Sequence, residues 1–202
     1  MKALLLKEYD SNQSTYAATF IFFAVAAWVI GDDQIPSFVS ILFVGVYLFS
    51  TSYVDDQNNS HILINSLPVN RCLVVTSKYI NGLLVGMLLL ILTIVPNILI
   101  PGYTPLTEIA LAAAAIMMVI AFYYPIYIIF GHRFMGYVFS AVLIGLLVMG
   151  PILSNTNVLD TIVIFLQQQS TVALMTGVTA ASILILILSW MISVRVYVAK
   201  QF

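Results

Sequence analysis

The chain has 202 residues, of which 62% are hydrophobic and only 7% are charged, and its formal net charge is −1. A soluble domain carries about a quarter of charged residues, so this composition excludes a water-exposed globular surface and indicates lipid as the main solvent. The charge balance leaves no basic field that would indicate a nucleic-acid partner. We therefore expect an all-α integral membrane protein, and its single cysteine, Cys72, excludes an internal disulfide framework.

The first residues do not read as a cleaved signal. Their short apolar run is broken by Lys7, Glu8 and Asp10, and no small-residue cleavage site follows a long apolar core. We expect residues 2–10 to form an amphipathic helix that lies at the membrane interface and leads into the first span.

A spanning helix needs about 20 mostly apolar residues. On this criterion the sequence predicts about six spans, all in a single membrane domain that comprises residues 1–202, because no polar stretch is long enough for a soluble domain. The predicted spans are residues 16–30, 35–53, 79–100, 106–130, 137–153 and 171–194.

Residues 160–171, between the fifth and sixth predicted spans, contain the uncharged run TIVIFL. This run is too short to cross the bilayer but apolar enough to enter it. We expect a short re-entrant or interfacial segment on the outer side, with a plain external loop as the alternative.

The cations predict the orientation. With six spans, both termini and the connections after the second and fourth spans share one side of the membrane. That side carries all the lysines and arginines, and the other side carries only acids. Because Lys and Arg accumulate in cytoplasmic loops, we expect both termini in the cytoplasm. The cations are Lys2, Lys7, Arg71, Lys78, Arg133, Arg195 and Lys200, and the acids of the other side are Asp32, Asp33, Glu108 and Asp160.

Several classes of function leave no trace in the sequence. No predicted span has Asp, Glu, Lys or Arg in its interior, which disfavours transport driven by a buried carboxylate. H-E-x-x-H, G-x-S-x-G and P-loop motifs are missing, so we expect no catalytic residue, metal or cofactor in this chain. Asp55 and Asp56 are adjacent, and we interpret them as the end of a span and the cap of the next helix.

Gly82 and Gly86 form a G-x-x-x-G motif in the third predicted span. Such a motif lets two helices approach closely. We expect packing within the chain, with a contact to a second subunit as the alternative.

The polar stretch between the second and third spans predicts a corner. Residues 58–67 have the pattern of a short amphipathic helix lying along the membrane face. Pro68 disfavours a helical Leu67, and Asn70 is a good N-cap for a new helix that starts near Arg71. A span, a transverse helix, a corner and a span would present a rigid surface to the cytoplasm, suited to docking a partner; an ordinary amphipathic linker is the alternative.

The same stretch carries a resemblance. D-D-Q-N-N-S, L-I-N-S-L-P-V-N-R and V-V-T-S-K-Y resemble the signature of the small permease subunits of the ABC-2 transporter superfamily. The length and the six predicted spans agree with that family along essentially the whole chain, whereas Asn70 and Cys72 depart from its usual pattern.

The resemblance implies an elbow helix at residues 2–10 and a coupling helix that docks onto a separate cytoplasmic ABC ATPase. It also implies that ATP and Mg²⁺ bind to that ATPase, and that a second permease subunit, identical or different, completes the path in a bacterial inner or plasma membrane. The implied docking residues are Asn58, Asn59, Ser60, His61, Ile62, Leu63, Asn65, Leu67, Pro68, Asn70 and Arg71.

The function implied is that of a permease subunit in an ATP-driven exporter of a hydrophobic or amphipathic substrate, such as antimicrobial or toxin peptides of the phenol-soluble modulin kind. Two alternatives are a non-transporting membrane immunity or sensor subunit and an intramembrane enzyme. Arg71 and Lys78 would either bind lipid phosphates or meet acids on the ATPase.

Overall fold

The computed structural model describes residues 12–30, 35–58, 70–98, 105–154 and 171–199. These residues form a helical bundle, and each of the six predicted spans corresponds to one helix. The helices are α2 (Gln13–Ile30), α3 (Ser37–Gln57), α5 (Arg71–Ile98), α6 (Pro105–Phe130), α7 (His132–Ser154) and α9 (Thr171–Ala199).

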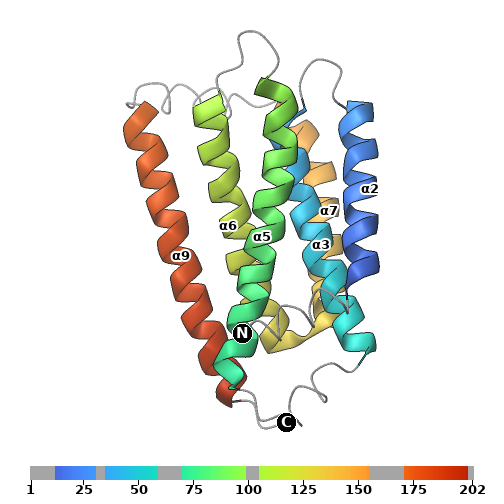
Figure 1. Cartoon of the computed structure of the whole chain (residues 1–202), viewed down its shortest axis with the longest axis vertical. Helices are drawn as coiled ribbons and strands as arrows, with labels where there is room; N and C mark the ends of the chain where they lie inside the picture. Colours follow the sequence, from blue (N-terminus) through green and yellow to red (C-terminus); the bar gives the residue numbers. More distant parts are fainter. Residues whose placement is uncertain (1–11, 31–34, 59–69, 99–104, 155–170, 200–202) are drawn as a thin grey trace.

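Consecutive helices run in opposite directions, so that the helix ends gather at two levels (Figure 1). The end of α3, the start of α5, the α6–α7 junction and the end of α9 lie together at the lower level of that view. We call this level the charged end, because all charged residues of the described ranges except Glu108 lie near it. They are Asp55, Asp56, Arg71, Lys78, Arg133 and Arg195. Glu108 lies at the opposite level, which we call the far end.

The described helices have the length and composition of membrane spans. Four segments are long and apolar enough to cross a bilayer, and α2 contains a shorter apolar helix, Gln13–Val29. The four segments are Ser37–Gln57, Arg71–Ile98, Glu108–Phe130 and Met175–Ala199. The chain is therefore an all-helical integral membrane protein, as its composition predicted.

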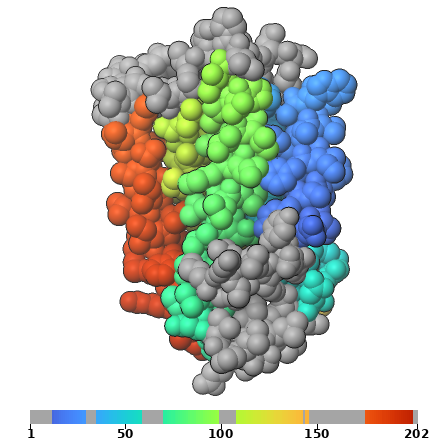
Figure 2. Space-filling view, viewed as in Figure 1, coloured from blue at the N-terminus to red at the C-terminus, as the bar shows by residue number. Residues whose placement is uncertain are grey.

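The centre of the bundle is formed by α3 and α6. Helix α3 contacts α2, α5, α6 and α7, and α6 contacts α3, α5, α7 and α9. Val44, Leu48, Leu89 and Ile120, from α3, α5 and α6, are fully buried between them. The outer surface seen in Figure 2 is formed by α9, α5 and α2, with α6 visible between the first two. Large apolar side chains such as Trp28 face outward, as a lipid solvent requires.

Five helices extend at the charged end beyond the spans predicted from the sequence. Helix α3 continues to Gln57 instead of residue 53, α7 starts at His132 instead of residue 137, and α9 continues to Ala199 instead of residue 194. Helix α2 starts at Gln13 instead of residue 16, and α5 starts at Arg71, where the Asn70 cap predicted a helix start, instead of at residue 79, where its span was predicted. The prediction stopped at charged and polar residues because they are unfavourable in lipid. The structure satisfies several of them inside the bundle, so the helices do not end there.

The junction between α6 and α7 is a single residue, Gly131, with φ of +81°. Its N–H donates to the carbonyl of Tyr127 at 2.8 Å and closes the last turn of α6. Only glycine adopts this left-handed conformation without a steric penalty. Gly131 therefore lets the chain turn from α6 into α7 without a longer loop. Pro96 and Pro125 lie inside α5 and α6, and both helices continue past them.

Three predicted features lie outside the described residues: the elbow helix at residues 2–10, residues 59–69 of the coupling helix and its corner, and the re-entrant segment up to residue 170. They stay predictions, as does the single-domain assignment.

Candidate functional site

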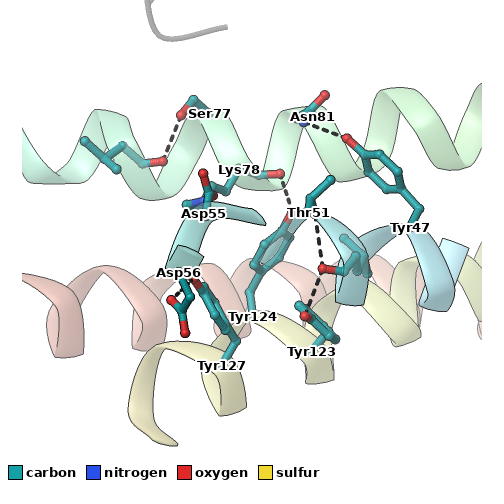
Figure 3. Close-up of polar contacts among 12 residues, drawn as sticks. Tyr47, Thr51, Asp55, Asp56, Ser77, Lys78, Asn81, Tyr123, Tyr124 and Tyr127 are labelled. Atoms are coloured by element: carbon teal, nitrogen blue, oxygen red, sulfur yellow. Dashed lines mark hydrogen bonds and ion pairs between the residues drawn. The ribbon is translucent and has the colours of Figure 1, made fainter. Parts of the chain in front are cut away.

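A buried ion pair joins α3 to α5 at the charged end. The Lys78 ammonium donates to the Asp55 carboxylate. The side chain of Asp55 is 5% exposed and that of Lys78 is 17% exposed. Taking two charges out of water is costly, and only good geometry and further hydrogen bonds offset that cost. The ion pair therefore fixes how α3 and α5 lie relative to each other at this end (Figure 3).

Three tyrosines of α6 complete the polar contacts around this pair. The Tyr124 hydroxyl donates to the backbone carbonyl of Lys78 at 2.7 Å, and the Tyr127 hydroxyl donates to Asp56 Oδ1 at 3.3 Å. The Tyr123 hydroxyl donates to the carbonyl of Leu48 in α3 at 2.9 Å. A buried tyrosine hydroxyl needs a partner, and all three partners lie on α3 or α5. Helix α6 is thus bonded to both helices that flank the connection 58–70.

Helix α9 is bonded to the same part of α5. The Tyr79 hydroxyl lies 2.7 Å from Ser189 Oγ and 2.8 Å from Ser193 Oγ, one helical turn apart. The Trp190 indole N–H donates to Thr76 Oγ1 at 3.1 Å. Because Tyr79 follows Lys78 in the chain, α9 and α3 are bonded to adjacent residues of α5.

Three further hydrogen bonds join α5, near the charged end, to α3, to α2 and to the end of α9. Asn81 Nδ2 donates to the Tyr47 hydroxyl at 2.9 Å, and the Tyr16 hydroxyl of α2 donates to Asn81 Oδ1 at 2.6 Å. Arg71, the first residue of α5, donates to the carbonyl of Val198 at 3.2 Å. In the described residues, α5 therefore has polar contacts with α2, α3, α6 and α9.

The far end is also tied together. Asn97 Oδ1 accepts from the Ile35 N–H at 2.9 Å, and Asn97 Nδ2 donates to the Ile35 carbonyl at 2.8 Å. One side chain of α5 thus satisfies both backbone groups of Ile35, which lies just before Pro36 and the start of α3. Ser37 at the start of α3 donates to Glu108 at the start of α6. Helices α3, α5 and α6 are thus linked at both ends.

The structure places three of the predicted docking residues. Asn58 closes α3, since its N–H donates to the carbonyl of Val54 at 3.0 Å. Asn70 caps α5 as predicted, with its Oδ1 accepting from the Cys72 N–H at 3.0 Å. Arg71 contacts the end of α9. The other predicted docking residues lie outside the described ranges: Asn59, Ser60, His61, Ile62, Leu63, Asn65, Leu67 and Pro68.

Of two interpretations of charged residues, one was right in its tested part and one was wrong. Asp55 and Asp56 end the second span as expected, in the last turns of α3, where they contact Lys78 and Tyr127. The helix that they were expected to cap lies outside the described residues. Lys78, which was expected to bind lipid phosphates or acids on the ATPase, pairs with Asp55 of the same chain. No local pattern of the sequence shows that Asp55 and Lys78 meet across two helices.

Gly82 and Gly86 face α6 and α3 of the same chain. A Cβ atom at residue 86 would lie 2.7 Å from Ile116 Cγ2, and one at residue 82 would lie 3.1 Å from the Tyr124 hydroxyl oxygen. Gly82 therefore leaves the space through which Tyr124 reaches the carbonyl of Lys78. The close approach predicted from G-x-x-x-G is present within the chain.

Two grooves open along the sides of the bundle. One, of about 420 Å³, lies among α3, α6 and α7 and is apolar along nearly all of its lining. The other, of about 580 Å³, lies between α2 and α3 and combines apolar side chains with hydroxyls. The residues lining this second groove are Ser14, Thr15, Ala18, Thr19, Phe22, Phe43, Val46 and Ser50.

No curated protein and no solved structure matches the chain. A family model described as "ABC-2 family transporter protein" matches residues 3–198, almost the whole sequence. The chain therefore belongs to the ABC-2 family of transporter proteins, as a membrane-spanning permease subunit of an ABC transporter, a system that includes a partner ATPase.

Proposed function

We propose that the chain forms half of the translocation path of an ATP-driven exporter. ATP and Mg²⁺ bind to the separate cytoplasmic ATPase, and a second permease subunit, identical or different, completes the path. The observation that carries this proposal is the family match over residues 3–198. The gathering of polar contacts at the charged end, which flanks residues 58–70, supports the location of the ATPase contact.

The distribution of cations supports an orientation with the charged end in the cytoplasm. Every lysine and arginine in the described ranges lies at that end, in agreement with the positive-inside rule. Both chain termini would then be cytoplasmic. The cations are Arg71, Lys78, Arg133 and Arg195.

The connection between α3 and α5 is the proposed docking surface. Helix α3 ends at Gln57 and α5 starts at Arg71, so the docking residues lie between two helices that are bonded to each other. At 1.5 Å per residue, α5 projects about 10 Å past Lys78. A partner that moves this connection would act on both helices as a rigid body.

The proposed substrate is a hydrophobic or amphipathic molecule, with phenol-soluble modulin-like peptides as the class to test. Charged residues of the described helices lie within about two turns of the helix ends, so the middle of the bundle offers no ionic site. The groove between α2 and α3 combines hydroxyls and apolar side chains, which suits an amphipathic molecule or a membrane lipid.

Reconstitution tests the proposal. The chain, its partner ATPase and any second permease subunit are co-expressed, purified and placed in liposomes, and ATP-dependent movement of a fluorescent amphipathic helical peptide is measured. Ile62, Leu63 and Leu67 are changed together to alanine. Since interface anchors contribute about 1–2 kcal/mol each, we expect ATPase binding to weaken at least about tenfold and transport to fall with it.

The matched control is Leu84→Ala together with Leu88→Ala, two exposed leucines of α5 that are far from the connection. We expect this variant to bind the ATPase as the wild type does. Unchanged ATPase binding by the triple variant would rule out docking through residues 58–71. A wild-type complex that binds the ATPase but moves no peptide would favour a sensor or immunity role over export of this substrate class.

A further inference from the structure

We infer that Asp55 and Lys78 form a positioning pair, which makes α3 and α5 move together when the ATPase acts on the connection between them. This inference rests on the proposed function. It concerns how a movement at the charged end reaches the helices that line the path, and it assigns that transmission to one ion pair and to the tyrosines bonded beside it.

The position of the pair carries the first step. Asp55 lies in the last turn of α3, and Lys78 lies about two turns into α5. The ion pair is therefore close to both helix ends that the connection 58–70 joins. A displacement of the connection pulls on the end of α3 and on the start of α5. With the pair in place, the two helix ends keep their separation; without it, each can move alone.

The surroundings of the pair carry the second step. Tyr124 bonds to the carbonyl of Lys78, and Tyr127 bonds to Asp56, the neighbour of Asp55. Lys78 and the residue next to Asp55 are therefore both bonded to the same helix, α6. Tyr79, the next residue after Lys78, bonds to Ser189 and Ser193 of α9. A joint movement of α3 and α5 thus reaches α6 and α9 through bonds at residues adjacent to the pair.

The chemistry of the pair carries the third step. A buried ion pair contributes little to stability in comparison with apolar residues of similar volume, but it fixes geometry because both charges must stay matched. At 5% and 17% exposure, neither side chain can be fully solvated without moving the helices. A neutral, well-packed replacement would keep the bundle folded and lose the directional constraint. Stability and coupling can therefore be separated by experiment.

The experiment compares four complexes with the ATPase in liposomes: wild type, the neutral double variant Asp55→Asn with Lys78→Met, the exchanged pair Asp55→Lys with Lys78→Asp, and Glu108→Gln. ATP hydrolysis and movement of the fluorescent amphipathic peptide are measured on the same samples, and both are normalised to folded protein from size-exclusion chromatography. The quantity that decides is the amount of peptide moved per ATP hydrolysed.

We expect the neutral double variant to bind the ATPase and hydrolyse ATP, while the peptide moved per ATP falls at least about tenfold. The exchanged pair should restore at least a third of the wild-type ratio, because the attraction is symmetric. Glu108→Gln, which keeps a hydrogen bond to Ser37 at the far end, should leave the ratio within twofold of the wild type.

Two results would overturn the inference. If the neutral double variant yields less folded protein but keeps the wild-type ratio, the pair serves stability alone. If the exchanged pair is as uncoupled as the neutral variant although it folds, the charge attraction does not transmit the movement. A wild-type complex that neither binds an ATPase nor moves the peptide would instead overturn the proposed function, and the inference with it.

Discussion

Gly86 sets how closely α5 approaches the centre of the bundle. It is buried, and its missing side chain leaves room for Ile116 of α6 and Val44 of α3. Helix contacts in membranes depend on such close packing, because lipid provides no hydrophobic driving force between helices. The sequence motif was enough to predict a close approach at this residue. It could not identify α6 as the partner, because the partner depends on the arrangement of the whole bundle.

We predict that Gly86→Ala destabilises the protein by about 1–3 kcal/mol, because the new methyl group would overlap Ile116 Cγ2. The matched control is Gly177→Ala in α9, where an added Cβ has no heavy atom within 4 Å. That change should be neutral or stabilising by up to about 1 kcal/mol, from helix propensity. Thermal unfolding midpoints in detergent measure both, and equal midpoints for the two variants would contradict the packing at Gly86.

Polar side chains within the bundle are the part of the site that the sequence did not reveal. Tyr123, Tyr124 and Tyr127 look like ordinary aromatic residues of an apolar span, yet each hydroxyl bonds to α3 or α5. Their spacing places them on neighbouring faces of one helix, which is a signal that buried polar groups gather there. Their partners include two backbone carbonyls, and no sequence pattern identifies those.

At the scale of elements, apolar runs predicted the six helices and some of their ends, such as Ile30, Phe130 and Thr171, but not the ends that carry charged residues. The ends differ most where charged residues find partners, as Lys78 does with Asp55. Hydropathy assigns a charge to water, whereas the bundle satisfies it within the protein. The start of α5 was nevertheless predicted correctly from capping chemistry, because Asn70 acts on the backbone of its own neighbours.

The first turn of α5 depends on that cap. We predict that Asn70→Ala costs about 1 kcal/mol in local stability, since the Cys72 N–H loses its acceptor. Amide hydrogen exchange in the first turn should then rise about fivefold. Asn70→Ser, which retains a capping oxygen, is the control and should exchange nearly as slowly as the wild type. Equal exchange in the alanine variant would show that water or another group replaces the cap.

At the scale of the whole molecule, alternating helix directions and the cation distribution lead to one arrangement. The orientation that we propose has the charged end in the cytoplasm and the α2–α3 connection, which contains Asp32, on the other side. The sequence predicted the alternating helices with the described cations at one end, because connectivity and charge are global properties that small errors in helix bounds do not change.

Cysteine labelling tests the orientation. In a Cys72→Ser background, single cysteines are placed at Asp32 and at Asn70 and exposed to a membrane-impermeant maleimide in intact cells. We expect labelling at residue 32 and protection at residue 70 until the membrane is opened. One span, α3, lies between the two positions and places them on opposite sides of the membrane. Labelling of both positions in intact cells would contradict the six-span arrangement.

The glycine turn between α6 and α7 has a consequence for how the protein is made. Only one residue separates Phe130 from His132, so the junction offers no polar loop between the two helices. We therefore expect α6 and α7 to enter the bilayer together as one helical hairpin, with Arg133 beside the turn.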